Sequence, residues 1–232
     1  MKNRKLFLLS FLTVFFVSFY IIFLPKEAEC GQIYAVNNIN FAGKVLPLSA
    51  VWHKAVQKAV PLNIMTYAVK KAYFKAVVIH GRVYFRLKWH DPSPVFRIKS
   101  PNMFADGAAV AFPLSPVKGY LPPICMGGSG PKNEVNIWHW RANFKNDYAE
   151  NLVSGGMGTL TVSPDPSLHQ EAKWKNGYWY VEFSRPLNDK NGAMLKRGKV
   201  YYAAVGIWDG FDRERAMKKS VSYWFPIKIK IN

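Results

Sequence analysis

The sequence contains few cysteines and no recognisable catalytic motif. Only Cys30 and Cys125 occur among its 232 residues, which excludes a disulfide framework, a paired-cysteine zinc site and a set of iron–sulfur ligands. The five histidines share no metal-ligand spacing. A nucleophile elbow, a phosphate-binding loop, a paired-acid arrangement and an internal repeat are all absent from the sequence. These absences argue against an enzyme acting through its own side chains, and against a solenoid or propeller.

Acidic residues are also scarce. The chain has 14 Asp and Glu against 32 Lys and Arg, a formal net charge of +18. Residues 1–30 hold four basic and two acidic side chains, which leaves +16 on residues 31–232. In a cytoplasmic protein this excess would suggest nucleic-acid binding.

The first thirty residues have the pattern of an export signal. A basic start is followed by an uncharged run over residues 6–24, and Ala28-Glu29-Cys30 offers a cleavage site. The run is also long enough to span a bilayer, so residues 1–30 are either a signal peptide or an N-terminal membrane anchor. Both interpretations place residues 31–232 in the periplasm or outside the cell. There the positive charge either serves to meet acidic proteins or anionic lipids, rather than nucleic acid, or only aids solubility.

Alternating hydrophobicity predicts strands along much of this region. Residues 82–90 alternate after a His80-Gly81 turn, and residues 178–184 alternate after Asn176-Gly177. Residues 199–208 form a small-residue strand expected to be buried on both faces, and residues 225–231 alternate between apolar residues and lysine. The pattern predicts one mainly β domain over residues 31–232, an antiparallel β-sandwich with long loops and a few short helices.

Helical periodicity is weak, and two long loops are more informative. Residues 50–59 and 64–72 are the helix candidates. One loop, residues 113–134, is rich in Pro and Gly, with Cys125-Met126 near its centre, and a second, residues 209–220, is strongly charged. Long irregular loops on a rigid scaffold commonly carry function.

A series of short motifs runs in order over nearly the whole predicted domain. They are Leu46-Pro-Leu…Trp52, Tyr84-Phe-Arg-Leu-Lys-Trp-His-Asp91, Phe104-Ala-Asp-Gly-Ala-Ala-Val-Ala-Phe-Pro113, Met126-Gly127, Val135-Asn-Ile-Trp-His-Trp-Arg141, Gly177-Tyr-Trp, Phe183-Ser-Arg-Pro-Leu187, Ile207-Trp-Asp-Gly210 and Lys219-Ser-Val-Ser-Tyr-Trp224. In these motifs the chain resembles the haem-b-binding γ subunits of the ethylbenzene dehydrogenase and dimethylsulfide dehydrogenase group of molybdoenzymes.

The resemblance implies a haem iron held by a methionine and a lysine. The methionine position corresponds to Met126, and the lysine position to Lys219, with the adjacent Lys218 as the alternative. The haem would be non-covalent, because the sequence has no Cys-x-x-Cys-His motif. With both axial positions filled by the protein, the iron would have no vacancy for a substrate, so the resemblance implies electron transfer rather than catalysis.

The resemblance also implies partners: a molybdopterin catalytic subunit and an iron–sulfur subunit, with a soluble cytochrome or a quinone-linked donor or acceptor beyond them. Trp138, Trp140 and Trp224 are candidates for the apolar walls of a haem cleft. His139 is expected to be a hydrogen-bonded core histidine, and Asp91 and Asp106 to form turns. The alternative function is a secreted, cofactor-free β-sandwich binding module that resembles carbohydrate-binding domains.

Overall fold

The computed structural model describes residues 34–98, 100–144 and 148–231. The predicted signal peptide or membrane anchor, residues 1–30, lies outside these ranges. Within them, no helix is long and apolar enough to cross a membrane.

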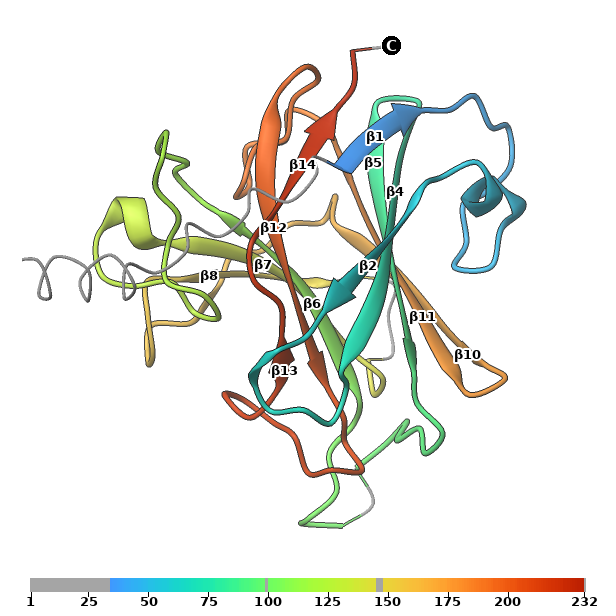
Figure 1. Cartoon of the computed structure of the whole chain (residues 1–232), viewed down its shortest axis with the longest axis vertical. Coiled ribbons are helices and arrows are strands. Elements are labelled where there is room, and N and C mark those ends of the chain that lie inside the picture. Colours follow the sequence, from blue (N-terminus) through green and yellow to red (C-terminus); the bar gives the residue numbers. More distant parts are fainter. Residues whose placement is uncertain (1–33, 99, 145–147, 232) are drawn as a thin grey trace, which may run out of the picture. The chain divides into compact units, whose positions relative to one another are not determined.

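Strands make up almost all of the regular structure (Figure 1). The described strands are β1 (Tyr34–Asn38), β2 (Gln57–Pro61), β3 (Ile64–Met65), β4 (Lys71–Ile79), β5 (Arg82–His90), β6 (Gly107–Pro113), β7 (Val135–Arg141), β8 (Glu150–Ser154), β9 (Thr161–Val162), β10 (His169–Lys175), β11 (Tyr178–Pro186), β12 (Val200–Trp208), β13 (Ser220–Val221) and β14 (Phe225–Ile229). Two short 3₁₀ helices, η1 (Ala50–His53) and η2 (Pro131–Asn133), complete the described elements.

The strands form two antiparallel layers that β1 joins at one edge. Hydrogen bonding runs in the order β10-β11-β5-β4-β1-β14-β12-β6-β7-β8-β9. β1 pairs in parallel with both β4 and β14, while the other named strand pairs are antiparallel. One layer therefore contains β2, β4, β5, β10 and β11, and the other contains β6 to β9 and β12 to β14.

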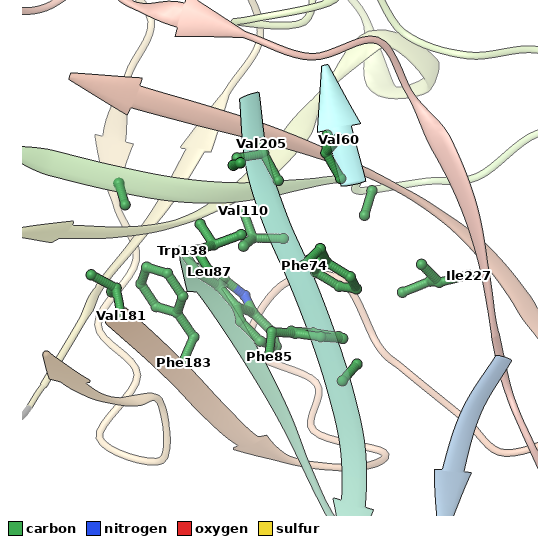
Figure 2. Packing of buried hydrophobic residues seen from close by; sticks show 14 of the residues in the cluster. Val60, Phe74, Phe85, Leu87, Val110, Trp138, Val181, Phe183, Val205 and Ile227 are labelled. Atoms are coloured by element: carbon green, nitrogen blue, oxygen red, sulfur yellow. The ribbon is translucent and has the colours of Figure 1, made fainter. Parts of the chain in front are cut away.

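Aromatic side chains join the two layers into one core (Figure 2). The Phe85 ring from the first layer lies 5.6 Å from the Phe112 ring and 5.5 Å from the Trp138 ring of the second, between ring centroids. Phe74 and Phe225 meet across the layers in an edge-to-face pair at 5.2 Å, an arrangement that aromatic quadrupoles favour. The predicted mainly β sandwich is confirmed.

The strand predictions are largely confirmed and the helix predictions are wrong. β5, β11, β12 and β14 fall where alternation placed them, and the turn residues at 80–81 and 176–177 adopt positive φ. Residues 50–59 form η1 and then enter β2, and residues 64–72 form β3, a loop and the start of β4. Cross-strand pairing outweighs the weak helical spacing in both segments.

A buried ion pair lies at the edge of this core. The Arg185 guanidinium is 3.4 Å from the Asp165 carboxylate, and both side chains are almost completely buried. Arg185 also donates to the carbonyl oxygen of Asn191 at 2.9 Å and stacks over the Trp138 ring at 4.8 Å. Neither charge is exposed to water, so each depends on the other for compensation.

Candidate functional site

A cavity of about 620 Å³ lies on the face of β6, β7 and β12 that points away from the core. Strands β8, β9 and β13 extend its wall, and loop residues close over it from positions 98, 104–105, 125–126, 143, 157–158, 160, 214–217 and 219. Its volume is within the range of about 300–1,000 Å³ typical of small-molecule and cofactor sites. Both long loops singled out from the sequence contribute residues to this cavity.

The floor of the cavity consists of very small side chains. Along β6, Gly107, Ala109 and Ala111 line the cavity, while the alternate residues Ala108 and Val110 belong to the core. The neighbouring strand β12 adds Ala204 and Gly206. Because side chains alternate across a strand, one face of each strand fills the core while the other leaves space. A flat, largely apolar ligand can therefore approach the sheet backbone closely.

Met126 reaches the cavity from the Pro- and Gly-rich loop. Its carbonyl oxygen accepts hydrogen bonds from the Ser154 hydroxyl at 2.7 Å and from the Gly156 amide at 3.0 Å, which ties the loop to the end of β8. The chain turns at Gly127, with φ +69°, where a Cβ would collide with the carbonyl oxygen of Asn133. Glycine is therefore required beside the methionine.

Lys219 reaches the cavity from the charged loop and is only 4% exposed. Its Nζ donates to the carbonyl oxygen of Ala216 at 3.1 Å and lies 5.1 Å from the centre of the Trp208 ring. Burial lowers the pKa of this amine, and the nearby Cys125 thiol acts in the opposite direction. Lys218 differs from Lys219 in burial and position. It is exposed, it does not line the cavity, and its Nζ donates to the carbonyl oxygen of Asp212 at 2.7 Å.

The base of the charged loop is fixed to β3 and its flanking residues. The buried Glu214 carboxylate accepts a hydrogen bond from the Thr66 hydroxyl and another, at 2.9 Å, from the amide of Asp209. The Thr66 amide donates to the carbonyl oxygen of Lys219 at 3.1 Å, and the Thr66 hydroxyl lies 3.2 Å from that of Ser220. The lysine backbone is thus held from two directions.

The Trp208-Asp209-Gly210 motif fixes the other end of this loop. The Gly210 amide donates to the buried Asp106 carboxylate at 2.8 Å, and a Cβ on Gly210 would collide with the carbonyl oxygen of Phe104. Asp106 also accepts from the Val95 amide at 2.7 Å and from the Trp179 indole at 3.0 Å. Its buried carboxylate therefore joins three separate segments of the chain rather than forming a local turn, whereas Asp91 forms the expected turn by accepting from the Ser93 amide at 2.9 Å.

His139 and Glu150 form a polar pair in the cavity wall. The His139 Nδ1 lies 2.7 Å from a Glu150 carboxylate oxygen, and burial lowers the pKa of the imidazole. The hydrogen bond to His139 is the main reason that the pKa of Glu150 is lowered. The histidine is hydrogen-bonded, as expected, but its ring faces the cavity rather than the core.

The tryptophans proposed as cleft walls lie elsewhere, and that prediction is wrong. Trp138 and Trp140 are on the core face of β7, opposite the cavity. Trp224 packs behind the Met126 loop, where its indole donates to the carbonyl oxygen of Pro122 at 2.9 Å. The tryptophan that does line the cavity is Trp208. The sequence of β7 does not show which of its two faces packs on the core, because apolar side chains lie on both faces.

Sequence reasoning also missed several cavity residues. The small side chains of β6 alternate with Val110 and Phe112 in the sequence, and this alternation could have identified them as the floor of a cavity. Glu214, Arg141 and Arg215 carry no local signal, because their place in the cavity depends on how the loops close.

A solved structure with a similar fold is a family 9 carbohydrate-binding module from Caldicellulosiruptor kristjanssonii in complex with glucose. The two chains are 11% identical, the TM-score is 0.50, and the match covers 84% of this chain and 95% of that one. At this level of identity the likeness concerns the β-sandwich fold alone.

Proteins found by sequence comparison are more similar to this chain than that structure is. The chlorate reductase subunit gamma of Ideonella dechloratans is 34% identical over 212 residues, covering 86% of each chain. The "Putative respiratory nitrate reductase heme subunit ORF7" of Haloferax mediterranei is 30% identical over 189 residues, covering 77% of this chain and 66% of that one. Residues 49–164 and 159–220 match the protein family described as ethylbenzene dehydrogenase. Because this match covers most of the chain and agrees with a full-length relative, the chain belongs to the ethylbenzene dehydrogenase family.

Proposed function

We propose that this chain is the non-catalytic, electron-transferring γ subunit of a periplasmic molybdenum oxidoreductase, with one non-covalent haem b and Met126 and Lys219 as its axial ligands. The observation that carries the proposal is that the Met126 and Lys219 side chains, 93 residues apart in sequence, line the same cavity, whose floor consists of glycine and alanine.

The cavity has the properties that a haem requires. Its lining is mostly apolar, and its floor of glycine and alanine leaves space over the sheet for a flat macrocycle. A thioether and a lysine amine are both present, and relatives in the family are described as a chlorate reductase γ subunit and a nitrate reductase heme subunit.

The environment of Lys219 favours ligation. A lysine binds iron only as the neutral amine, and the ordinary pKa of about 10.4 keeps the free side chain protonated. Burial in the cavity lowers the pKa of Lys219 and so makes loss of the proton easier. Met126 adds a neutral, soft sulfur donor, which favours the ferrous state. Lys218, held at the surface by Asp212, lacks this environment.

A haem in this cavity would supply reversible one-electron chemistry. The residues of the chain would hold it, exclude water from its faces and fill both axial positions, which leaves no vacancy for a substrate. Electrons would pass between this subunit and an iron–sulfur subunit of the complex, and from there to or from a molybdopterin catalytic subunit. A soluble cytochrome or a quinone-linked partner would exchange electrons on the other side, and the segment 1–30 would direct the chain out of the cytoplasm.

The test is an absorbance spectrum of the full chain reconstituted with haem, before and after reduction with dithionite. The parent protein should show the sharp bands of a six-coordinate low-spin haem. Met126→Ala and Lys219→Ala should each lose them, whereas Lys218→Ala is the matched control and should match the parent.

Two outcomes would contradict the proposal. A folded parent that binds no haem would favour a cofactor-free binding module. A normal spectrum in Lys219→Ala together with a degraded one in Lys218→Ala would reassign the lysine ligand.

A further inference from the structure

The charged side chains that line the cavity gather at one end of it. Gly107 at the start of β6 pairs with Arg141 at the end of β7 and with Trp208 at the end of β12. Glu150 starts β8 beside this point, and Arg215 stacks on Phe104, three residues before Gly107. Both cavity arginines, Arg141 and Arg215, therefore lie at the Gly107 end.

Arg215 presents a positive charge for which the described residues supply no acidic partner. Its guanidinium carbon lies 4.6 Å from the centre of the Phe104 ring, and Phe104 also lines the cavity. Arg215 takes part in no ion pair among residues 34–98, 100–144 and 148–231. The nearby cavity carboxylate of Glu214 is occupied by Thr66 and by the Asp209 amide. The guanidinium donors of Arg215 thus remain available at the cavity rim.

Arg141 is held in a similar way. Its guanidinium carbon lies 5.0 Å from the centre of the Phe144 ring. It contacts one Glu150 oxygen at 3.5 Å, while the other oxygen is within 2.7 Å of His139. A single long contact leaves most of the five donors of a guanidinium unused. Two guanidinium groups, each packed against a phenylalanine ring, therefore lie at the Gly107 end of the cavity.

At the opposite end of the cavity, none of the described lining residues carries a guanidinium group. Val162 on β9 pairs with Leu152, which is in register with Ile137 and Ala111, the far end of the floor. Ala111 comes four residues after Gly107, which is about 13 Å along a strand. The rim here is formed by Met157, Leu160 and Val162, which are 77%, 50% and 59% exposed.

We infer that Arg141 and Arg215 bind the two carboxylates of the haem and so fix the orientation of the macrocycle in the cavity. This inference rests on the proposed function. Guanidinium groups recognise carboxylates through charge-assisted, often bidentate hydrogen bonds. A carboxylate at the opposite end would be solvated beside the exposed side chains of Met157, Leu160 and Val162, but it would gain no hydrogen bond from a guanidinium group. The apolar edge of the macrocycle would then face Met157 and Leu160.

The experiment compares two ligands: haem b and its dimethyl ester, in which both carboxylates are neutral. Dissociation constants are measured by absorbance titration of the full chain for the parent, Arg141→Gln, Arg215→Gln and the double variant. Arg213→Gln is the matched control, because Arg213 is an exposed arginine of the same loop that does not line the cavity. Unfolding midpoints in urea verify that each variant is folded.

The parent should bind haem b more tightly than the ester, by at least tenfold. Each single substitution should weaken haem b binding about tenfold, since hydrogen bonds to charged groups have this strength, and should leave ester binding nearly unchanged. Arg213→Gln should behave like the parent. Equal affinity of the parent for both ligands would overturn the inference while leaving the proposed function intact. A parent that binds neither ligand would instead overturn the proposed function.

Discussion

Two neighbouring alanines on β6 offer a sharp test of the two faces of this strand. Ala108 is completely buried in the core between the layers, and Ala109 faces the cavity. A leucine adds three carbons at either site. At position 108 there is no room for them, and overpacking of a filled core costs about 1–3 kcal/mol. At position 109 they enter open space, where burial of each methylene contributes up to about 0.8 kcal/mol, so Ala109→Leu should be about 2 kcal/mol more stable at most, and no less stable than the parent.

Ligand binding should follow the opposite order. The leucine at position 109 would project into the space that a macrocycle has to occupy, so haem binding should fall by at least a hundredfold, while Ala108→Leu should retain it as long as the protein stays folded. Urea unfolding in the absence of ligand gives the first quantity and absorbance titration with haem the second. Equal destabilisation by both substitutions, or normal haem binding by Ala109→Leu, would show that the space above β6 is not the binding site.

Other features lead to further predictions. Asp165→Ala should destabilise the fold by about 3–5 kcal/mol because it leaves the buried Arg185 charge uncompensated; a change below about 1 kcal/mol in urea unfolding would contradict the assigned pairing. Burial raises the pKa of Glu182 to about 8, above its unfolded value, so its contribution to stability is complete below about pH 4.5 and is lost as the pH rises through 8. Glu182→Gln should therefore remove about 4 kcal/mol of the fall in stability between pH 5 and pH 9, and an unchanged pH profile would refute this. Gly127→Ala should weaken haem binding more than tenfold, whereas Gly130→Ala, which also has positive φ but open space around it, should have little effect; equal effects would point to backbone strain alone.

The sequence predicts those elements of the fold in which local pattern and tertiary environment agree. The sequences of β5 and of residues 179–184 in β11 alternate between apolar and more polar side chains because one face of each strand meets the core, and their turns carry Gly after a residue that tolerates positive φ. The segments predicted as helices failed for the opposite reason. Residues 50–59 have apolar residues at spacings that suit a helix, yet residues 57–61 pair in antiparallel register with residues 71–75 of β4.

The site was predictable to a smaller extent. Family resemblance singled out Met126 and Lys219, and the structure brings both side chains to one cavity while leaving Lys218 at the surface. The walls could not be derived, because alternation along β7 does not say which face meets the other sheet. Trp138 looked like a cofactor-binding residue, and it is instead the side chain on which Phe85 and Arg185 pack.

The small-residue floor of β6 also has a consequence for the life of the protein in the cell. Beside the cavity, Ala109, Val135, Ile137 and Leu152 form a separate hydrophobic cluster, and three of these four side chains line the cavity: Ala109, Ile137 and Leu152. The core between the layers is thus completed by the side chains of the chain itself, whereas under the proposed function the haem would cover this second cluster. A ligand that binds the folded state alone stabilises it by about 2.7 kcal/mol at a hundred times its dissociation constant. If the proposed function is correct, the amount of this chain that survives proteolysis should therefore rise and fall with the supply of haem.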